Sequence, residues 1–210
     1  MHVARCGDIQ LRINPHLPPG LVQVTLSGCP HRQTSLAGLA IAHRDDIDGV
    51  AEEDDFSQLA ADHALYAAPN PARELQIVGV DHVVVLADDV RATCAEIERL
   101  SGAPLKRVKE GQRGTQGFHR WGSVILEVVE RRLVHPKPSD AGSNPPGSPG
   151  SPSASYWGFV VVVDDIDATT AWLGPDVIGA PKMAVQTGRR IATVRSAAGL
   201  GVPLAFMSRE

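Results

Sequence analysis

The sequence is poor in aromatic residues and cysteine, and it has no long uncharged apolar stretch. Only 4% of its 210 residues are Phe, Trp or Tyr, and its three cysteines form no CxxC pair. Cysteines that are so few and so far apart argue against a disulfide framework and are typical of a reducing compartment. No apolar run approaches the roughly 18 residues that a membrane-spanning helix needs. We therefore expect a cytoplasmic protein that does not enter a membrane.

An excess of basic charge and the common catalytic signatures are also missing. The formal net charge is -4 at pH 7 and the pI is near 6.0, whereas a nucleic-acid-binding protein needs a clustered basic face. The sequence contains no GxxxxGK phosphate loop, no GxSxG nucleophile turn and no GxGxxG dinucleotide fingerprint. We expect a small-molecule ligand and no nucleic-acid partner, with the chain acting as a monomer or a homodimer.

Glycine and proline, by contrast, are abundant, with 20 and 16 residues respectively. Residues 135–154 alone contain six Pro, three Gly and five Ser, a composition that forms neither a sheet ladder nor a core. We interpret this segment as a flexible linker. It separates residues 75–134 from residues 155–210, and each of these stretches is small for an independent domain.

Acidic charge is concentrated in residues 1–74, which carry ten acidic and five basic side chains. This segment also holds only two of the nine aromatic residues, Phe56 and Tyr66. Few packing anchors and a block of like charge predict a disordered N-terminal arm. The alternative is marginal structure, with one strand at Leu21–Leu26 and one short helix at Phe56–Tyr66.

The two stretches on either side of the linker share one plan. The runs VDHVVVLADDV (80–90) and WGFVVVVDDID (157–167) align on Asp88 and Asp164, at an offset of 76 residues. Short β-branched runs indicate buried strands, and the helical segments that follow end at Gly102 and Gly174. Three further strand signals separated by glycines come next in each stretch. We predict an α+β protein with two tandem β-α-β-β-β modules.

This repeat, with DHVVV in its first strand and ILEVVE in a last strand, resembles the vicinal oxygen chelate superfamily. That superfamily includes glyoxalase I, bleomycin-resistance proteins and extradiol dioxygenases, and the chain looks most similar to bacterial glyoxalase-like proteins. The resemblance implies two modules whose sheets curve around a shared cleft for a small molecule. In many members the cleft also holds a divalent metal.

The resemblance implies metal ligands on the first and last strands of each module. His82 and Glu127 match those positions in the first module. The second module has Gly158, with Leu204 or Ala205, none of which can coordinate a cation through a side chain. His119 would add a third ligand only if it faced the cleft. Because a catalytic site usually needs about three protein ligands, a divalent metal is possible but a ligand-contacting or structural His82–Glu127 pair is favoured. Without a metal, the pair could act as an acid/base couple.

Four further residues are candidates for contacting a substrate. Strand alternation places Arg190 on the more apolar face of its strand, where it could bind an anion. Trp121, Trp157 and Phe206 could line an apolar pocket. A solvated strand end for the arginine and plain core packing for the aromatics are the alternatives.

The leading hypothesis is a glyoxalase-like enzyme, of lyase, isomerase or dioxygenase type, that acts on a small oxygenated metabolite. The alternative is a protein that sequesters a small molecule without chemistry, as bleomycin-resistance proteins do. A further hypothesis concerns residues 1–74: because the resemblance begins near Val78, the arm could be an over-extended translation from a wrongly assigned start.

Overall fold

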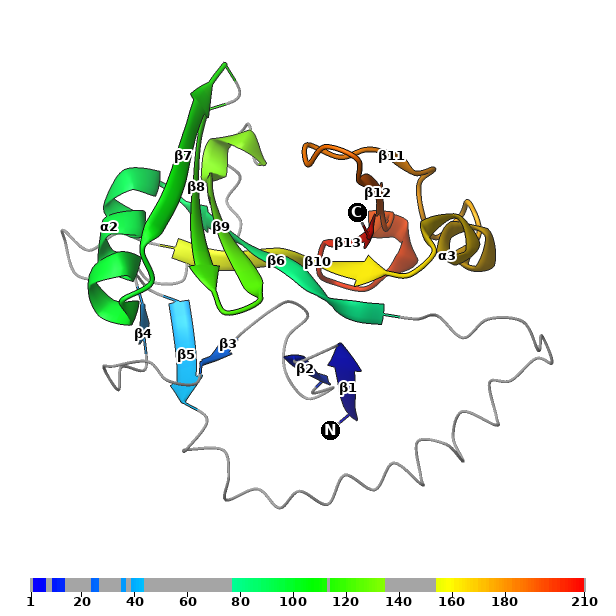
Figure 1. The fold of residues 1–210 in the computed structure, drawn as a ribbon, viewed down its shortest axis with the longest axis horizontal. Coiled ribbons are helices and arrows are strands. Elements are labelled where there is room, and N and C mark those ends of the chain that lie inside the picture. The colour runs from blue at the N-terminus through cyan, green and yellow to red at the C-terminus, as the bar shows by residue number, and fades with distance from the viewer. Residues whose placement is uncertain are drawn as a thin grey trace.

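A computed structural model describes residues 2–6, 9–13, 24–26, 35–36, 39–43, 77–112, 114–134 and 154–209 (Figure 1). Eight strands form one sheet in the order β11-β12-β13-β10-β6-β9-β8-β7. The sheet is curved and unclosed. Within the described residues, no helix is long and apolar enough to cross a membrane.

Each module contributes four neighbouring strands and one α-helix. The first consists of β6 (Ile77–Ala87), α2 (Val90–Ser101), β7 (Leu105–Gly111), β8 (Gly114–Trp121) and β9 (Val124–Glu130), followed by the 3-10 turn η2 (Arg131–Leu133). The second consists of β10 (Ala154–Val163), α3 (Ile166–Leu173), β11 (Lys182–Met183), β12 (Arg190–Thr193), the 3-10 turn η3 (Ser196–Ala198) and β13 (Leu204–Ser208). In both modules the first strand pairs in parallel with the last, and the remaining pairs are antiparallel. The predicted pair of β-α-β-β-β modules and the α+β class are confirmed.

The starts of the two helices follow the predicted offset of 76 residues. Asp89 and Asp165 are the N-caps, and each side chain accepts a 2.9 Å hydrogen bond from the backbone N–H three residues later. Gly102 ends α2 in the left-handed conformation, at φ 70°, which glycine adopts without steric cost. The local sequence therefore fixes both ends of α2 and the start of α3.

The modules join through the antiparallel pairing of β6 with β10, which runs from Ala87↔Ala154 to Ile77↔Val163. Each of these strands contains a β-bulge, an extra residue with no opposite partner. In β10 the extra residue is Trp157. In β6 there are two, Asp81 between the partners of Val160 and Val161, and Val78 between the partners of Val162 and Val163. Asp81 and Trp157 lie at equivalent positions of the repeat, 76 residues apart.

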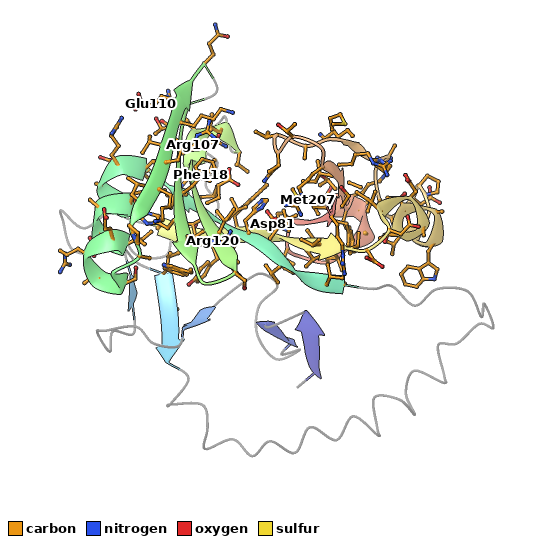
Figure 2. The ribbon with its side chains drawn as sticks, viewed as in Figure 1. Asp81, Arg107, Glu110, Phe118, Arg120 and Met207 are labelled. Carbon is orange, nitrogen blue, oxygen red and sulfur yellow. The ribbon has the colours of Figure 1, made fainter. Side chains whose placement is uncertain are left out.

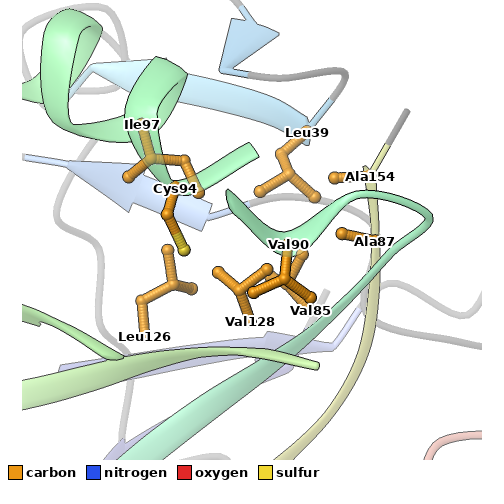
Figure 3. Packing of buried hydrophobic residues seen from close by; sticks show 9 residues of the cluster. All are labelled: Leu39, Val85, Ala87, Val90, Cys94, Ile97, Leu126, Val128 and Ala154. Carbon is orange, nitrogen blue, oxygen red and sulfur yellow. The ribbon is translucent and has the colours of Figure 1, made fainter. Parts of the chain in front are cut away.

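Both helices pack on the same face of the sheet. Under α2 lies a core that includes Val85, Cys94 and Leu126 (Figure 3), and under α3 lies a second core that includes Val161, Ile166 and Phe206. Figure 1 shows the two helices at opposite ends of the sheet. We call the other side the helix-free face; its buried residues include Val84, Leu86 and Val129 in the first module and Val160, Ala205 and Met207 in the second.

The described residues of the N-terminal segment form five short strands. They are β1 (His2–Cys6), β2 (Ile9–Ile13), β3 (Val24–Leu26), β4 (Ser35–Leu36) and β5 (Leu39–His43). Leu39 is 1% exposed and packs in the core under α2, and the hydroxyl of Tyr156 donates a 3.0 Å hydrogen bond to the carbonyl of Ala40. The sequence predicted no folded contact for this part of the arm. Residues 44–76, with the alternative helix at 56–66, and residues 135–153 of the predicted linker lie outside the described residues.

Candidate functional site

The register of β6 and β9 brings His82 and Glu127 together on the helix-free face. Glu127 pairs with Val84, two residues along β6 from His82, and residues two apart on a strand share a face. The imidazole Nε2 of His82 lies 3.5 Å from Oε2 of Glu127, with the side chains 11% and 16% exposed. The structure therefore places these two predicted residues side by side and largely out of water.

The other ring nitrogen of His82 is held by Asp81, the bulged residue of β6 (Figure 2). Oδ2 of Asp81 lies 2.8 Å from Nδ1 of His82. Nη1 of Arg189 donates to the second carboxylate oxygen, Oδ1, at 2.5 Å, and Nε of Arg189 donates to the carbonyl of Ser208 at 2.9 Å. Because the bulge turns Asp81 out of strict alternation, two consecutive side chains of β6 act on the same side of the sheet.

Glu127 has a further partner in Gln116 of β8, whose Nε2 donates to Oε1 of Glu127 at 3.0 Å. Asp81, Gln116 and Arg189 were not predicted from the sequence. For Asp81 the available signal was its position directly before His82. For Arg189 the signal was the alternation along β12. Alternation puts Arg189 and Arg190 on opposite faces of the sheet but does not show which face carries His82 and Glu127.

The two carboxylates of this cluster titrate in opposite directions. Burial raises the pKa of Glu127, and the positive charges of His82 and Lys109 only partly oppose it. Burial also acts to raise the pKa of Asp81, but the hydrogen bonds from His82 and Arg189 outweigh it and lower that pKa below its ordinary value. An ionised Asp81 accepts a hydrogen bond from Nδ1 of His82, which leaves Nε2 directed towards a carboxyl group that holds its proton more tightly than usual.

The donor set does not fit the divalent metal site that the resemblance implied. The sheet register makes Ala205 the counterpart of Glu127, since Ala205 pairs with Val160 as Glu127 pairs with Val84. A Cβ at Gly158, the counterpart of His82, would overlap the backbone of Pro203. The second module therefore supplies no ligand, and its packing leaves no room for one at Gly158.

His119, the third candidate ligand, points to the opposite face of the sheet. Its Nδ1 lies 3.0 Å from the carbonyl of Ala103, the side chain is buried, and burial lowers its pKa. Among the described residues, no group of three His, Cys, Asp or Glu side chains could hold a metal ion. Two donors, His82 and Glu127, fall short of the usual three.

The arginine that contacts this cluster is Arg189, whereas the sequence singled out Arg190. The apolar face of β12 is indeed the core face, since Ala192 is fully buried, but that core lies under α3. Arg190 extends from this face to Asp167 of α3, with bonds of 2.9 and 2.6 Å. Strand alternation placed Arg190 correctly on the apolar face, but it does not identify which face carries the His82–Glu127 cluster, and an anion contact by Arg190 stays a prediction.

The three aromatic candidates are divided between the two faces. Trp121 and Phe206 pack in the cores under α2 and α3 respectively, which is the plain packing considered above as the alternative. Trp157 packs on the helix-free face with Val84 and Leu86. An open hollow at the start of α2, lined by Asp88, Asp89, Val90, Arg91, Thr115 and Glu130, shares no residue with the His82–Glu127 site.

Comparison with known proteins identifies the fold. No protein-family model matches the chain, and neither does any curated protein sequence. Among solved structures, a methylmalonyl-CoA epimerase is similar with a TM-score of 0.50 and 17% identity, over 66% of this chain and 99% of that one. The enzyme of the same name from Mycobacterium tuberculosis matches with a TM-score of 0.48 and 13% identity, over 66% and 92% of the two chains. Methylmalonyl-CoA epimerase belongs to the vicinal oxygen chelate superfamily, and the likeness to the first of these structures shows that this chain has the superfamily's fold.

Proposed function

We propose, from this fold and from the His82–Glu127 pair, that the protein is a small-molecule enzyme of isomerase or lyase type that moves a proton on an oxygenated metabolite. The observation that carries the proposal is the cluster itself. A Glu with a raised pKa lies 3.5 Å from a His whose far nitrogen is hydrogen-bonded to an ionised Asp. Perturbed carboxylates that contact a histidine are typical of acid/base sites.

The geometry supports proton transfer without a metal. With Asp81 ionised and Nδ1 of His82 donating to it, one proton is left for Nε2 of His82 and Oε2 of Glu127 to share. The member of the pair that lacks the proton can accept one from a C–H next to a substrate carbonyl, leaving the electron pair on the enolate. The member that holds a proton can return one to the carbon. Return to the opposite face gives an isomer, and loss of a leaving group from the enolate gives a lyase reaction.

The solved epimerase with the TM-score of 0.50 lends support at the level of reaction class. An epimerase inverts a stereocentre, and removal and return of a proton at an acidic carbon achieves this. At 17% identity the likeness extends to the fold, so we do not transfer that protein's CoA thioester to this chain. A small oxygenated metabolite with an acidic C–H is the substrate class that the cluster supports.

Basic residues beside the pair favour an anionic substrate. Arg107 of β7 pairs with Phe118, which pairs with Glu127, so all three lie in one row on the helix-free face. Lys109 lies on the same face and its charge acts on Glu127. In the described part of the chain, neither Arg107 nor Lys109 forms an ion pair with a carboxylate. We assign to them the anion contact that was expected of Arg190.

Deuterium exchange tests the proposal and does not require that the product be known. Small 2-hydroxy, 2-oxo and 3-oxo carboxylates are incubated with the protein in D2O, and loss of the α-proton signal is followed by proton NMR. At least one compound should exchange in a catalysed manner. Glu127→Gln and His82→Asn should each lower the rate by about 100-fold or more, while Glu98→Gln, on the exposed side of α2, should leave it unchanged.

The same panel separates the enzyme from its alternative, a sequestering protein. Many enzymes of this superfamily use a metal, so the lack of a third metal ligand beside His82 and Glu127 favours a sequestering protein. A sequestering protein would bind a compound, as seen by ligand-observed NMR, with no catalysed exchange and with affinity insensitive to Glu127→Gln. Exchange that survives Glu127→Gln would contradict the proposed role of the pair.

A further inference from the structure

Arg189 occupies a position that the proposed chemistry does not by itself explain. It begins the return from the β11–β12 turn in the second module, yet its guanidinium reaches Asp81 in the first. Both side chains are 11% exposed. An arginine and an aspartate that are this far buried are costly unless each finds its hydrogen bonds, so the pair is a fixed feature of the interior rather than a surface contact.

The guanidinium is held from two directions. Nε donates to the carbonyl of Ser208 at the end of β13, and Nη1 donates to Oδ1 of Asp81. The backbone of Arg189 is held too, because its carbonyl accepts from the N–H of Ala184 at 2.9 Å and its own N–H donates to the carbonyl of Gln186 at 3.2 Å. A planar guanidinium with two fixed donors sets the plane of the carboxylate that it binds.

The orientation of the Asp81 carboxylate in turn fixes the orientation of the His82 ring. With Oδ1 held by Arg189, Oδ2 is directed at Nδ1 of His82, 2.8 Å away. A hydrogen bond at one ring nitrogen decides both the tautomer and the direction of the other nitrogen. Nε2 is thereby placed opposite Oε2 of Glu127.

We propose that Arg189 is a positioning residue of the site, supplied by the second module, which fixes the Asp81 carboxylate and through it the tautomer and orientation of the His82 ring. The effect of this positioning on a reaction rests on the proposed function. It also gives the second module a role in the site, although that module contributes neither a counterpart of His82 nor one of Glu127. The acid/base pair belongs to the first module and its alignment depends on the second.

The neighbouring arginine provides a matched control. Arg189→Met keeps much of the buried apolar stem and removes the donors, whereas Arg190→Gln removes a guanidinium that is half exposed and bonded to Asp167. Nitrogen-15 NMR of the histidine side chains, with His82 assigned through His82→Asn, reports which ring nitrogen carries the proton. In the parent and in Arg190→Gln we expect the Nδ1–H form. In Arg189→Met the Asp81 carboxylate is no longer held in place, and we expect the ratio of Nδ1–H to Nε2–H to fall by about tenfold, as for the loss of the charge-assisted hydrogen bond between Asp81 and Nδ1 of His82.

Three outcomes decide the proposal. A shifted tautomer ratio in Arg189→Met, restored at least in part by Arg189→Lys, supports it. An unchanged ratio in a folded Arg189→Met protein overturns it, even if that variant is less stable, because a purely structural role would lower stability alone. If Arg189→Met does not fold, Asp81→Asn makes the same prediction, and an unchanged His82 tautomer there overturns the proposal.

The tautomer measurement requires no substrate, so its result is independent of the exchange assay. An absence of catalysed exchange together with a shifted tautomer would remove the proposed function and leave the positioning role of Arg189. If catalysed exchange is found, Arg189→Met should lower its rate with little change in the substrate concentration that half-saturates it. Arg107→Gln should instead raise that concentration.

Discussion

Gly158 prevents the second module from carrying a counterpart of His82. It stands where the first module has His82, and a side chain there would overlap the carbonyl of Pro203, which accepts the N–H of Phe159 at 3.1 Å. We predict that Gly158→Ala destabilises the protein by about 1–3 kcal/mol, because the obstacle is backbone and cannot rotate away. Gly79→Ala on β6 is the control, since nothing lies within 4 Å of its Cβ position. Equal midpoints for the two variants in urea denaturation would contradict this account.

Glu127 gives a pH-dependent prediction at the same scale. Its folded pKa is raised above the ordinary 4.5 by burial, so its contribution to stability is complete below that value and is lost as the pH rises through the folded pKa. Glu127→Gln removes this loss and keeps the side-chain shape. The free energy of unfolding, measured in urea between pH 4 and pH 8, should therefore fall less with rising pH in the variant than in the parent. Parallel profiles would show that the carboxyl is not desolvated.

Asp81 contributes in the opposite sense and in a different range. Its pKa is lowered from the ordinary 3.8, so the stability that it supplies is present above that value and is lost as the pH falls through the folded pKa. Acid denaturation below about pH 4 therefore reports on Asp81, and the range above reports on Glu127.

Among the elements, β5 contributes a core residue that the sequence did not predict. Leu39 at its start is fully packed under α2 beside Val85 and Ile97 (Figure 3). We predict that Leu39→Ala destabilises the full chain by about 2–5 kcal/mol, as other buried leucines do. Leu200→Ala, at a site 50% exposed, should cost less than about 0.5 kcal/mol. Thermal unfolding of the two variants provides the measurement, and similar midpoints would show that Leu39 does not pack in the core.

The same contact bears on the hypothesis that residues 1–74 come from a wrongly assigned start. A chain that begins after residue 74 would lack the Leu39 side chain and leave the core under α2 with a gap. Mass spectrometry of the native N-terminus remains the direct test of that hypothesis. Peptides from residues 1–70 in cell extracts would refute it.

At the scale of the whole molecule, the pairing of β6 with β10 makes the two modules one sheet. Their register extends along nearly the full length of both strands, and separating them would expose the cores on both faces. We predict that a protease site inserted between residues 135 and 153 can be cut without parting the halves, which should co-elute in size-exclusion chromatography under native conditions. Separation of the cut halves in native buffer would contradict the interlocked sheet. The uncut insertion variant is the control for the effect of the inserted sequence.

The sequence by itself determined the repeat, the order of its elements and the ends of α2, because β-branched runs, capping aspartates and glycines act over a few residues. Through the family resemblance it also singled out His82 and Glu127 in the first and last strands of a module, and the structure places their side chains 3.5 Å apart; their role in a reaction stays a proposal. Only the tertiary structure decided which face of β12 carries the site, that Trp121 and Phe206 belong to the cores under the helices, and that Asp81 joins His82. These depend on sheet register and on a bulge opposite a strand more than 70 residues away, and alternation along one strand contains no information about either.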